Sequence, residues 1–566
     1  MFKNLYENSV QIFPVNNSGK YLGKISSESS IYNSPIVYLL NNKKDLYIGE
    51  TINILNRFVS HNNNQSKKNL SIRHIIHSDF FNKSVILHLE AFLISHFSAE
   101  GSFNLLNGNL GNNSHYYYQK EEYERVFPLV WEKLQELNIA KKNIQEINNS
   151  DVFKYSPYKS LTIDQQDAII QILTDLSNNK KGIIINGSAG TGKTVLAIYL
   201  IKLLVTPIEY YENYEIDDSF SSEVISLLKF NLQKFNLEKD DIALVVSMSS
   251  LRKTLQDVFS KITGLDRKMV ISPTDIVKRK YKLVLVDESH RLKQRKNIPN
   301  YGSFDESNRT LGFEIDKGTE LDWILKQSNN QIFFYDRQQS IKPSDIEEEK
   351  FTSIASLPEY TNIFLKTQIR SKGGNLFTDF VNQLLDNTLM NDERFESEQF
   401  EFLLFDDISL LRDKIIERDN QVGLSRLVAG YSWEWISKKD KGLFDIVIDK
   451  TKLKWNSTYI SFINSPNAVN EVGCIHTTQG YDLNYVGVIF GEEIGYNKQT
   501  NSIEVYKDNY KDKNGKNNTN DSTLNQYIIN IYKTLLLRGI KGVYVYCCNK
   551  DLRDFFSQHI NIYNDK

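Results

Sequence analysis

Residues 187–194 read GSAGTGKT, and this segment constrains the fold more than any other part of the chain. It is a complete GxxxxGK[ST] phosphate loop. An apolar run at 182–185 precedes it, and a helix-like apolar stretch at 195–204 follows it. A phosphate loop between a strand and a helix is typical of nucleotide-binding α/β domains. The sequence therefore predicts a parallel sheet with this loop at the end of one strand.

Each residue type in the loop has a chemical purpose. Glycine reaches positive φ and lets the backbone approach an anion closely, so the β-phosphate of ATP is expected against the glycines. Lys193 is predicted to reach the β- and γ-phosphates, and Thr194 to ligate Mg²⁺. The loop thus predicts ATP and Mg²⁺ as cofactors, bound by Gly187, Gly190, Gly192, Lys193 and Thr194.

A second strand with a functional end is predicted from KLVLVDESH at 282–290. Its continuous apolar run is typical of a parallel strand that is buried on both faces. We expect Asp287 to hold Mg²⁺ through its water shell and Glu288 to orient or deprotonate the attacking water. His290 has two interpretations: coupling of the nucleotide state to the next domain, or a structural histidine.

Two glutamines are candidates for contacts with the nucleotide. The segment FFYDRQQ at 333–339 is another apolar strand with a polar end, which would bring Gln339 beside the γ-phosphate. LTIDQQDA at 161–168 precedes the phosphate loop, and Gln165 is expected to read the adenine edge. An amide side chain suits adenine because it both donates and accepts.

Residues 161–558 resemble a superfamily 1 helicase-type ATPase, and within it the Schlafen group 3-like helicase family. The resemblance rests on SLRKTLQDVF, ISPTDIVKRKYKLVLVDESHRL, LKTQIRSKGG, VGCIHTTQGYDLNYVGVIFG and LLLRGIKGVYVY, at 250–259, 271–292, 365–374, 472–491 and 535–546. It implies two RecA-like domains that clamp ATP between them.

The resemblance also implies roles for residues of the second RecA-like domain. Arg370 and Arg538 would reach the γ-phosphate, where a guanidinium stabilises the charge of the transferring phosphoryl group. Gln479 and Gly480 would link the nucleotide to the nucleic-acid track. Leu537 departs from the family pattern, which more often has threonine there.

The N-terminal part has its own pattern. IVYLL at 36–40 and LYIGE at 46–50 are short β-type runs joined by a hairpin-like turn, so Tyr38 and Tyr47 are expected in neighbouring strands. An amphipathic helix is predicted over 51–61. Farther on, Glu90 interrupts the apolar segment HLEAFLISHF, an odd place for a carboxylate without a partner.

Residues 34–112 resemble the GIY-YIG nuclease family, because YIGETINILNRFVSH at 47–61 follows the family spacing from YIG to arginine to histidine. One departure is Ile36-Val37-Tyr38, which lacks the glycine of the first motif. The resemblance implies phosphodiester hydrolysis by an endonuclease with one Mg²⁺ or Mn²⁺.

Position by position, the resemblance assigns the nuclease residues. Tyr38 or Tyr47 would help to activate the water, and Arg57 would stabilise the pentavalent phosphate. Glu90 would hold the metal, and Asn107 would complete the site. His61 would either orient Tyr47 or the water, or satisfy local hydrogen bonds.

The predicted fold class is α/β: a small α+β GIY-YIG domain followed by two RecA-like parallel-sheet P-loop NTPase domains. At 566 residues the chain has room for three or four domains. We predict a nuclease domain (1–115), a connecting helix and linker (116–160), a first RecA-like domain (161–358) with insertions near 206–241 and 295–325, and a second RecA-like domain (359–566). These insertions and a loop near 498–525 have no assigned role.

Composition narrows the partners. The net charge is −2, so a nucleic-acid surface must come from local clustering of basic residues. Three cysteines without CxxC spacing argue against disulfides or zinc and favour the cytoplasm. Since neither a signal peptide nor a long apolar run is evident, no membrane partner is expected.

The leading functional interpretation is an ATP-dependent nuclease-helicase that acts on nucleic acid, with DNA favoured over RNA. Such a fusion of a nuclease and a helicase, in a chain whose richness in Asn, Lys and Ile is typical of bacterial proteins from AT-rich genomes, suggests defence against foreign DNA such as phage, or repair and restriction. The alternative is a nucleic-acid-gated ATPase switch that controls a toxin-like RNase acting on tRNA or other RNA. A homo-oligomer and a protein partner encoded in the same operon both remain open.

Overall fold

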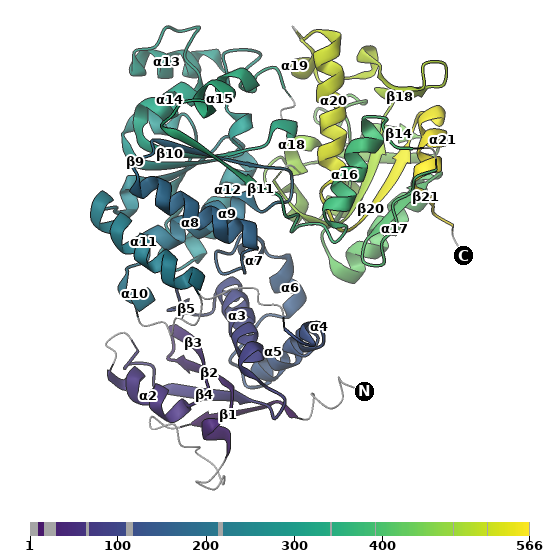
Figure 1. Cartoon of the computed structure of the whole chain (residues 1–566). Helices are drawn as coiled ribbons and strands as arrows, with labels where there is room; N and C mark the ends of the chain where they lie inside the picture. Colours follow the sequence, from purple (N-terminus) through teal and green to yellow (C-terminus); the bar gives the residue numbers. More distant parts are fainter. Residues whose placement is uncertain are drawn as a thin grey trace. The chain divides into compact units, whose positions relative to one another are not determined.

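The computed structural model describes residues 9–15, 30–63, 67–108, 117–212, 219–339, 342–390, 392–478, 480–517 and 519–564. It forms two compact units, considered separately below (Figure 1). The first contains the chain up to Ser177 together with Val195–Lys239 and Gln256–Met269. The second contains Asn178–Thr194, Asp240–Leu255 and the chain from Val270 onward.

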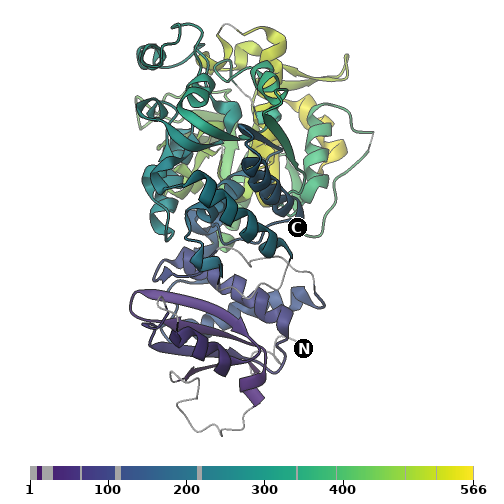
Figure 2. The same ribbon diagram turned by 60° about the vertical axis from the view of Figure 1, so that its left-hand side comes forward.

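The first unit begins with a small five-stranded sheet, visible as purple arrows in Figure 2. The strand order is β1-β4-β2-β3-β5, so neighbours in the sheet are not all neighbours in sequence. Its elements are β1 (Gln11–Val15), β2 (Ile36–Asn41), β3 (Asp45–Thr51), α2 (Ile54–Asn63), β4 (Ile72–His77), α3 (Lys83–Glu100) and β5 (Asn104–Leu105).

The predicted hairpin is present. Strands β2 and β3 pair antiparallel, with Tyr38 opposite Gly49 and Leu40 opposite Tyr47. Tyr38 and Tyr47 therefore lie in neighbouring strands, as expected. Helix α3 packs on β2 and β3, which brings Glu90 to this hairpin.

The predicted connecting helix and linker (116–160) is folded throughout its described part, including the polar stretch 140–160 that we expected to be the linker. The elements after the sheet are α4 (Lys120–Glu124), α5 (Phe127–Glu136), α6 (Ile144–Asn149) and α7 (Asp151–Lys154). Pro128 lies in the first turn of α5, where its missing N–H is tolerated. Helices α6 and α7 pack on α3 because Ile147 and Val152 are buried.

The insertion 206–241 contributes a helix to the first unit. This unit continues with α8 (Ile163–Ser177), most of α9 (Lys193–Val205), α10 (Glu209–Glu212), α11 (Ser219–Phe235) and the end of α12 (Ser249–Lys261). Helix α11 packs along α8, and the buried Asn231 donates to the carbonyl of Leu173 at 2.9 Å. Helix α11 of the insertion is therefore packed into the first unit through its contact with α8.

The second unit contains a six-stranded, all-parallel sheet in the order β11-β6-β10-β9-β7-β8. Its strands are β6 (Gly182–Gly187), β7 (Ile242–Val246), β8 (Val270–Ile271), β9 (Tyr281–Asp287), β10 (Ser328–Tyr335) and β11 (Tyr360–Leu365). In this order β6, which ends in the phosphate loop, lies between β11 and β10, and β10 separates β6 from β9.

The region near 295–325, predicted as an insertion without an assigned role, is largely helical. It contains α13 (Tyr301–Leu311) and α14 (Glu320–Gln327), and α15 (Glu348–Ala355) follows β10. Thr319 and Asp322 form a capping box that starts α14. The rings of Phe304 and Trp323 lie 4.6 Å apart and join the hydrophobic core of this sheet.

An eight-stranded sheet follows, in the order β14-β15-β16-β13-β17-β20-β12-β21. All its strand pairs are parallel except β14 with β15. The strands are β12 (Glu401–Phe405), β13 (Ser425–Ala429), β14 (Ile446–Ile448), β15 (Thr451–Trp455), β16 (Glu471–Gly473), β17 (Leu483–Phe490), β20 (Gly539–Cys547) and β21 (Asn561–Ile562).

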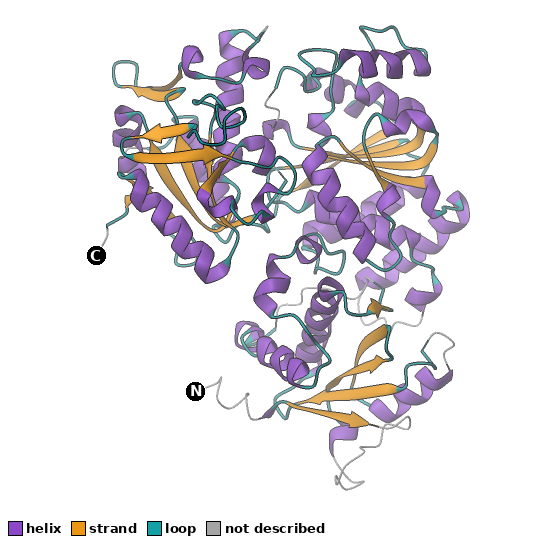
Figure 3. Ribbon diagram, turned by 180° about the vertical axis from the view of Figure 1, so that it is seen from behind, coloured by secondary structure: helices purple, strands orange, loops and turns teal. Residues whose placement is uncertain are grey.

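Helices cover both faces of this eight-stranded sheet (Figure 3). Val543 and Val545 of β20 join the core beneath α16, α20 and α21, whereas Tyr544 and Tyr546 join the core beneath α17. This alternation is what a strand buried on both faces requires. The remaining elements are α16 (Gly374–Leu385), α17 (Ile408–Val422), α18 (Ile475–Thr478), β18 (Ile494–Asn497), β19 (Ser502–Val505), α19 (Lys513–Lys516), α20 (Asp521–Leu536) and α21 (Lys550–His559).

The predicted fold class is confirmed: a small α+β domain precedes two parallel-sheet α/β domains. Within the described residues, no helix combines the length and the hydrophobicity needed to cross a bilayer.

Candidate functional sites

The phosphate loop connects β6 to α9 as predicted. Gly190 and Gly192 have φ of 86° and 79°, values that L side chains rarely adopt. Gly187 is required for a different reason, because a Cβ there would lie 2.6 Å from Oγ1 of Thr191. The three predicted glycines therefore shape the loop.

Lys193 is buried inside the loop. Its Nζ donates to the carbonyls of Gly187 at 2.5 Å and Ser188 at 3.0 Å, and lies 3.4 Å from Oδ2 of Asp336. Asp336 was not singled out from the sequence, although it lies in the FFYDRQQ segment. Its carboxylate balances the lysine charge in a site shaped for an anion.

Thr194 and Asp287 meet at the predicted metal position. The Thr194 hydroxyl donates to Oδ2 of Asp287 at 2.8 Å, across 93 residues of sequence. A hydroxyl and a carboxylate at this separation suit Mg²⁺, which takes few protein oxygens and keeps several waters. Burial and the neighbouring Glu288 carboxylate raise the pKa of Asp287 above its usual range.

Glu288 is held in a strained, left-handed conformation with φ of 49°. Burial alone would raise its pKa, but the contact with His290, reinforced by Lys193 and Arg538, lowers the pKa below its usual value. Nε2 of His290 lies 3.1 Å from Oε2 of Glu288. The histidine thus contacts the candidate catalytic carboxylate directly.

Gln339 and Arg538 join the two sheets of the second unit. Nε2 of Gln339 donates to Asp336 at 2.5 Å, and Nη2 of Arg538 donates to Oε1 of Gln339 at 3.4 Å. Arg538 is only 1% exposed and also donates to the carbonyl of Tyr481. It therefore lies among the residues predicted to surround the γ-phosphate.

Arg370 has a different environment. Its guanidinium forms an ion pair with Asp482, which like Arg370 itself follows β11 in sequence. The loop that carries it nevertheless contacts the phosphate loop: Gln368 donates to the carbonyl of Ala189 at 2.7 Å, and the Ile369 amide donates to that of Gly190 at 3.0 Å. Gln368 was missed from the sequence, although LKTQIRSKGG contains it.

Gly480 is placed where the two sheets' domains approach each other. Its φ is 86°, and a Cβ there would lie 3.0 Å from Leu251 of α12. Next to it, the Tyr481 hydroxyl lies 2.7 Å from Oγ1 of Thr254. The neighbouring Gln479 lies outside the described residues.

Gln165 is 1% exposed in α8 of the first unit. Its Oε1 accepts from the backbone N–H of Thr162 at 3.1 Å, close to the start of α8. The adenine contact remains a prediction.

A cavity of about 300 Å³ with several basic residues lies between residues of the two parallel-sheet domains. Ser247 and Ser250 lie nearby with buried hydroxyls that have no hydrogen-bond partner in the described part of the chain. Four basic side chains line it, which are Arg252, Arg291, Lys293 and Lys342, together with Asp345, which forms an ion pair with Arg291. A groove of this charge suits a phosphodiester backbone.

The nuclease candidates converge in the first unit. The Tyr38 hydroxyl lies 2.7 Å from Nε2 of His61 and accepts a hydrogen bond from Nε of Arg57 at 3.1 Å. Burial, Lys67 and Arg57 lower the pKa of His61 to about 2. The neutral His61 can accept a hydrogen bond from the Tyr38 hydroxyl, so the histidine contacts Tyr38 rather than only local backbone.

Two positions of the YIG-like motifs are explained by packing against Tyr38. A Cβ on Gly49 would lie 2.3 Å from the Tyr38 hydroxyl, so only glycine fits opposite this ring. Ile36, in the place of the missing glycine, is fully buried in the same core as Tyr38. The departure from the motif is thus accommodated by the core.

Three further residues lie in the candidate nuclease site around Tyr38 and Arg57: Tyr47, Lys67 and Glu90. Burial raises the pKa of Tyr47 to about 12 and that of Glu90 to about 8. Lys67, which no sequence motif indicated, places Nζ 3.5 Å from the centre of the Tyr47 ring. Burial lowers the pKa of Lys67 to about 7. Arg57 and Glu90 are half-buried, so they form the accessible edge of the site.

The Asn107 side chain forms hydrogen bonds with the backbone of strand β3 rather than with the other candidate residues. Its Nδ2 donates to the carbonyl of Ile48 at 2.7 Å, and its Oδ1 accepts from the Ile48 N–H at 3.1 Å. Ile48 stands between Tyr47 and Gly49. The amide thus fixes the position of β3, and both of its polar atoms are engaged.

Glu90 is a lone carboxylate rather than part of a ligand cluster. Across the described ranges, no group of three or more His, Cys, Asp or Glu side chains is arranged to hold a metal. The nearby Glu50 carboxylate pairs with Lys83 at 2.7 Å. A single carboxylate suits Mg²⁺, which binds through one or two carboxylates and keeps its waters.

Two family models match the chain, in the order that the residues indicated. The GIY-YIG catalytic domain model matches residues 34–104, and the model described as Schlafen group 3, DNA/RNA helicase domain matches residues 180–549. A curated relative is the uncharacterized protein YPL245W of Saccharomyces cerevisiae, 25% identical over 404 residues, which are 66% of this chain and 82% of that protein.

Solved structures give weaker matches. The Pif1 helicase of Candida albicans is 12% identical and covers 70% of this chain and 96% of its own, with a TM-score of 0.27. Bacteroides Pif1 bound to ssDNA is 10% identical and covers 68% and 92%, with a TM-score of 0.24. Similarity this low carries no argument about function.

Proposed function

Because the chain belongs to the Schlafen group 3 DNA/RNA helicase family and carries a GIY-YIG nuclease domain before the helicase domain, we propose an ATP-dependent nuclease-helicase that acts on DNA. It is a hydrolase that acts on nucleic acid. We further propose that it works in the cytoplasm of a bacterial cell in defence against phage. The local clusters of basic residues around the helicase domain support a polyanionic substrate.

The ATPase reaction is assigned to residues on both parallel sheets. Lys193 would leave the loop carbonyls for the β- and γ-phosphates, and Thr194 with Asp287 would hold Mg²⁺, which neutralises phosphate charge. Glu288 would orient the attacking water. Arg538 would stabilise the charge that develops on the γ-phosphate.

One observation carries the motor assignment: Arg538 and Gln339 are in contact, although they come from different RecA-like domains. A residue that spans two domains at the nucleotide couples ATP binding to domain movement. Arg370 is paired with Asp482, so it would have to exchange this partner for the γ-phosphate when ATP binds.

For the nuclease, the hydrogen bonds favour Tyr38 over Tyr47 as the residue that activates water. Burial raises the pKa of Tyr38, so its hydroxyl would keep its proton, donate it in a hydrogen bond to the neutral His61, and be held by Arg57 where the hydroxyl oxygen can orient the attacking water. Arg57 would also stabilise the pentavalent phosphate. A Mg²⁺ or Mn²⁺ ion held by Glu90 would support the leaving oxygen.

The decisive experiment measures cleavage, unwinding and ATP hydrolysis in one set of reactions. Purified full-length protein is incubated with labelled single-stranded, duplex and forked DNA and with matched RNA, with and without ATP and Mg²⁺. We expect ATP-dependent strand displacement of forked DNA and metal-dependent DNA cleavage.

The second candidate function predicts a different outcome. The contacts of Gln368 and Ile369 with the phosphate loop favour it, since they would have to rearrange when nucleotide binds and could gate hydrolysis. A nucleic-acid-gated switch would hydrolyse ATP without displacing a strand. Cleavage of RNA but not DNA would identify the alternative toxin-like RNase and overturn the DNA assignment.

A further inference from the structure

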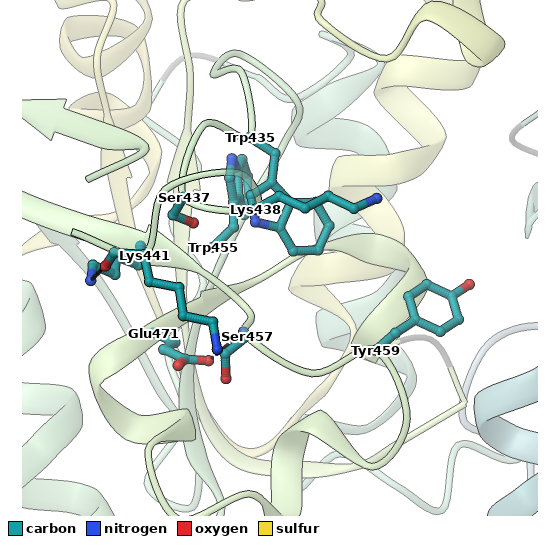
Figure 4. Close-up of a pocket in the computed structure, with 9 residues that line it drawn as sticks. Trp435, Ser437, Lys438, Lys441, Trp455, Ser457, Tyr459 and Glu471 are labelled. Atoms are coloured by element: carbon teal, nitrogen blue, oxygen red, sulfur yellow. Dashed lines mark hydrogen bonds between the residues drawn. The ribbon is translucent and has the colours of Figure 1, made fainter. Parts of the chain in front are cut away.

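A second cavity, of about 540 Å³, lies on the second RecA-like domain, apart from the ATPase residues (Figure 4). Its wall comes from the loop before β14, from β15 and from the segment that follows β15. A cavity of this volume accommodates a ligand of nucleotide size. The residues that carry the argument are Trp435, Lys438, Lys441, Trp455, Tyr459 and Glu471.

Aromatic rings give the cavity surfaces for stacking. Trp455 is 2% exposed and forms a rigid part of the wall, whereas Trp435 is half-buried and Tyr459 is 49% exposed. Figure 4 shows Trp435 and Tyr459 on different sides of the cavity. Exposed aromatic rings are costly to leave in water, and nucleic-acid bases stack on such rings without sequence preference.

The cavity also lies in a strongly basic segment. Residues 437–455 contain six lysines and three aspartates, in a chain whose net charge is only −2. Nζ of Lys438 lies 5.6 Å from the centre of the Trp435 ring, and Lys441 lines the same cavity. Positive charge beside an aromatic face matches a base with its phosphates.

A buried carboxylate fixes the shape of this cavity. Asp445 is 7% exposed and accepts hydrogen bonds from the Ser437 amide at 2.7 Å, the Ser437 hydroxyl at 2.5 Å and the Trp455 amide at 2.8 Å. These bonds tie the loop of Trp435 to β15. The aromatic surfaces are therefore pre-organised, which lowers the entropic cost of binding.

The cavity shares the lining residue Tyr459 with the basic cavity of the helicase domain. Because Tyr459 lines both cavities, a strand that contacts Arg252 and Lys342 in the basic cavity would pass Tyr459 on its way to Trp435. Glu471 supplies an acceptor at the cavity wall for an exocyclic amino group, while its Oε2 also accepts from the Ser457 amide at 2.7 Å.

We propose that this cavity holds one unstacked base of the single-stranded nucleic acid bound by the motor. The base stacks on Trp435, and Lys438 and Lys441 bind the adjoining phosphates. This inference rests on the proposed function, because it requires that the helicase domain binds a single strand. The proposed base site would give the protein a second contact with the strand, in addition to the basic cavity.

The first test is equilibrium binding of fluorescein-labelled 20-nucleotide DNA and RNA to the full chain without ATP. Trp435→Ala is expected to weaken binding by roughly tenfold, as for the loss of one stacked base. Trp435→Phe should restore most of the affinity because it keeps an aromatic face. The matched control is Lys439→Ala, since Lys439 is exposed in the same loop but does not line the cavity.

The second test separates phosphate binding from folding. For Lys438→Gln with Lys441→Gln, the slope of log affinity against log salt should become smaller by about 0.7 for each phosphate of a single strand that the variant no longer neutralises. A structural role alone would not change this slope. Photocrosslinking of an oligonucleotide that carries 5-iodouracil should modify the tryptic peptide 427–438.

The outcomes distinguish this inference from the proposed function. If the wild type binds a single strand and the Trp435 and lysine variants bind it with unchanged affinity and salt slope, the cavity is not a base site but the motor remains. If the wild type binds no oligonucleotide, both proposals are wrong. Equal binding of free mononucleotides and of the 20-mer at this cavity would also overturn the strand assignment.

Discussion

Arg538 donates to the side-chain oxygen of Gln339 at 3.4 Å, although 199 residues of sequence separate them. The arginine precedes β20 of the eight-stranded sheet, and the glutamine follows β10 of the six-stranded sheet. Gln339 in turn contacts Asp336, which contacts Lys193 of the phosphate loop. Movement of one sheet relative to the other is therefore linked to the position of the lysine.

Lys193→Ala and Glu288→Gln should each abolish nucleic-acid-stimulated ATP hydrolysis. The first removes the charge that faces the phosphates, and the second removes the carboxylate that orients water. Steady-state ATPase assays and binding of a fluorescent ATP analogue measure the two effects. Glu288→Gln should still bind ATP. Wild-type turnover in this variant would rule out Glu288 as the residue that activates water.

Arg538→Ala and Arg370→Ala should slow hydrolysis by roughly 10²-fold or more with nucleotide affinity nearly intact, as for arginine fingers. Single-turnover hydrolysis by nucleotide-saturated protein measures the effect. Arg309→Ala is a suitable control because Arg309 is exposed on α13. If either variant lost ATP affinity while bound ATP was hydrolysed normally, that arginine would have a binding role only.

Tyr38→Phe, His61→Ala, Arg57→Ala and Glu90→Gln should each eliminate metal-dependent cleavage. They remove the hydroxyl, the histidine that accepts its hydrogen bond, the cation that stabilises the transition state and the metal ligand. The ATPase should stay near the wild-type rate because these residues lie in the separate nuclease domain. Lys44→Ala, an exposed change in the same hairpin, is the control. If Tyr38→Phe cleaved at the wild-type rate, Tyr38 would not be the residue that activates water, and Tyr47 would be the remaining candidate.

Asn107→Ala should lower stability and cleavage together. The change removes both hydrogen bonds to the backbone of Ile48 and leaves buried groups without partners, at a cost of about 1–3 kcal/mol. Thermal unfolding and cleavage rates measure the two effects. Reduced cleavage with unchanged thermal stability would show instead that Asn107 contacts the substrate.

Stability should depend on pH through Lys202, which is 4% exposed and donates to the carbonyl of Thr263 at 2.9 Å. Burial lowers its pKa from 10.5 to about 8. Between these values the unfolded state binds more protons, so stability should rise with pH, by roughly 3 kcal/mol in total. Lys202→Met should remove this contribution. A pH profile of the melting temperature identical to that of the wild type would contradict it.

A last prediction concerns coupling between the two activities. If the motor delivers DNA to the nuclease, Lys193→Ala should change where or how much a long duplex is cut when ATP is present. Mapping of the cut sites for wild type and variant, with and without ATP, measures the effect. Identical cleavage in every condition would leave two activities that are only tethered.

Local sequence patterns determined much of this protein. The phosphate loop, the Asp287-Glu288 pair and the hairpin with Tyr38 and Tyr47 were all found from residues close together in sequence. Such motifs are readable because turn geometry and strand periodicity depend on neighbouring residues. The family resemblance then placed Arg538, which lies beside Gln339 in the structure.

Only the tertiary structure decided which distant side chains meet. Strand β6 pairs with β10 rather than with the next strand in sequence, and this pairing brings Asp336 to Lys193. Arg370 forms an ion pair with Asp482, a residue more than one hundred positions away in sequence, which the sequence did not indicate. The polar segment 140–160 became helical because two of its apolar residues find a partner in α3. Trp435 gained a cavity because Asp445 ties its loop to β15. Such contacts depend on strand order and long-range packing, which no local pattern encodes.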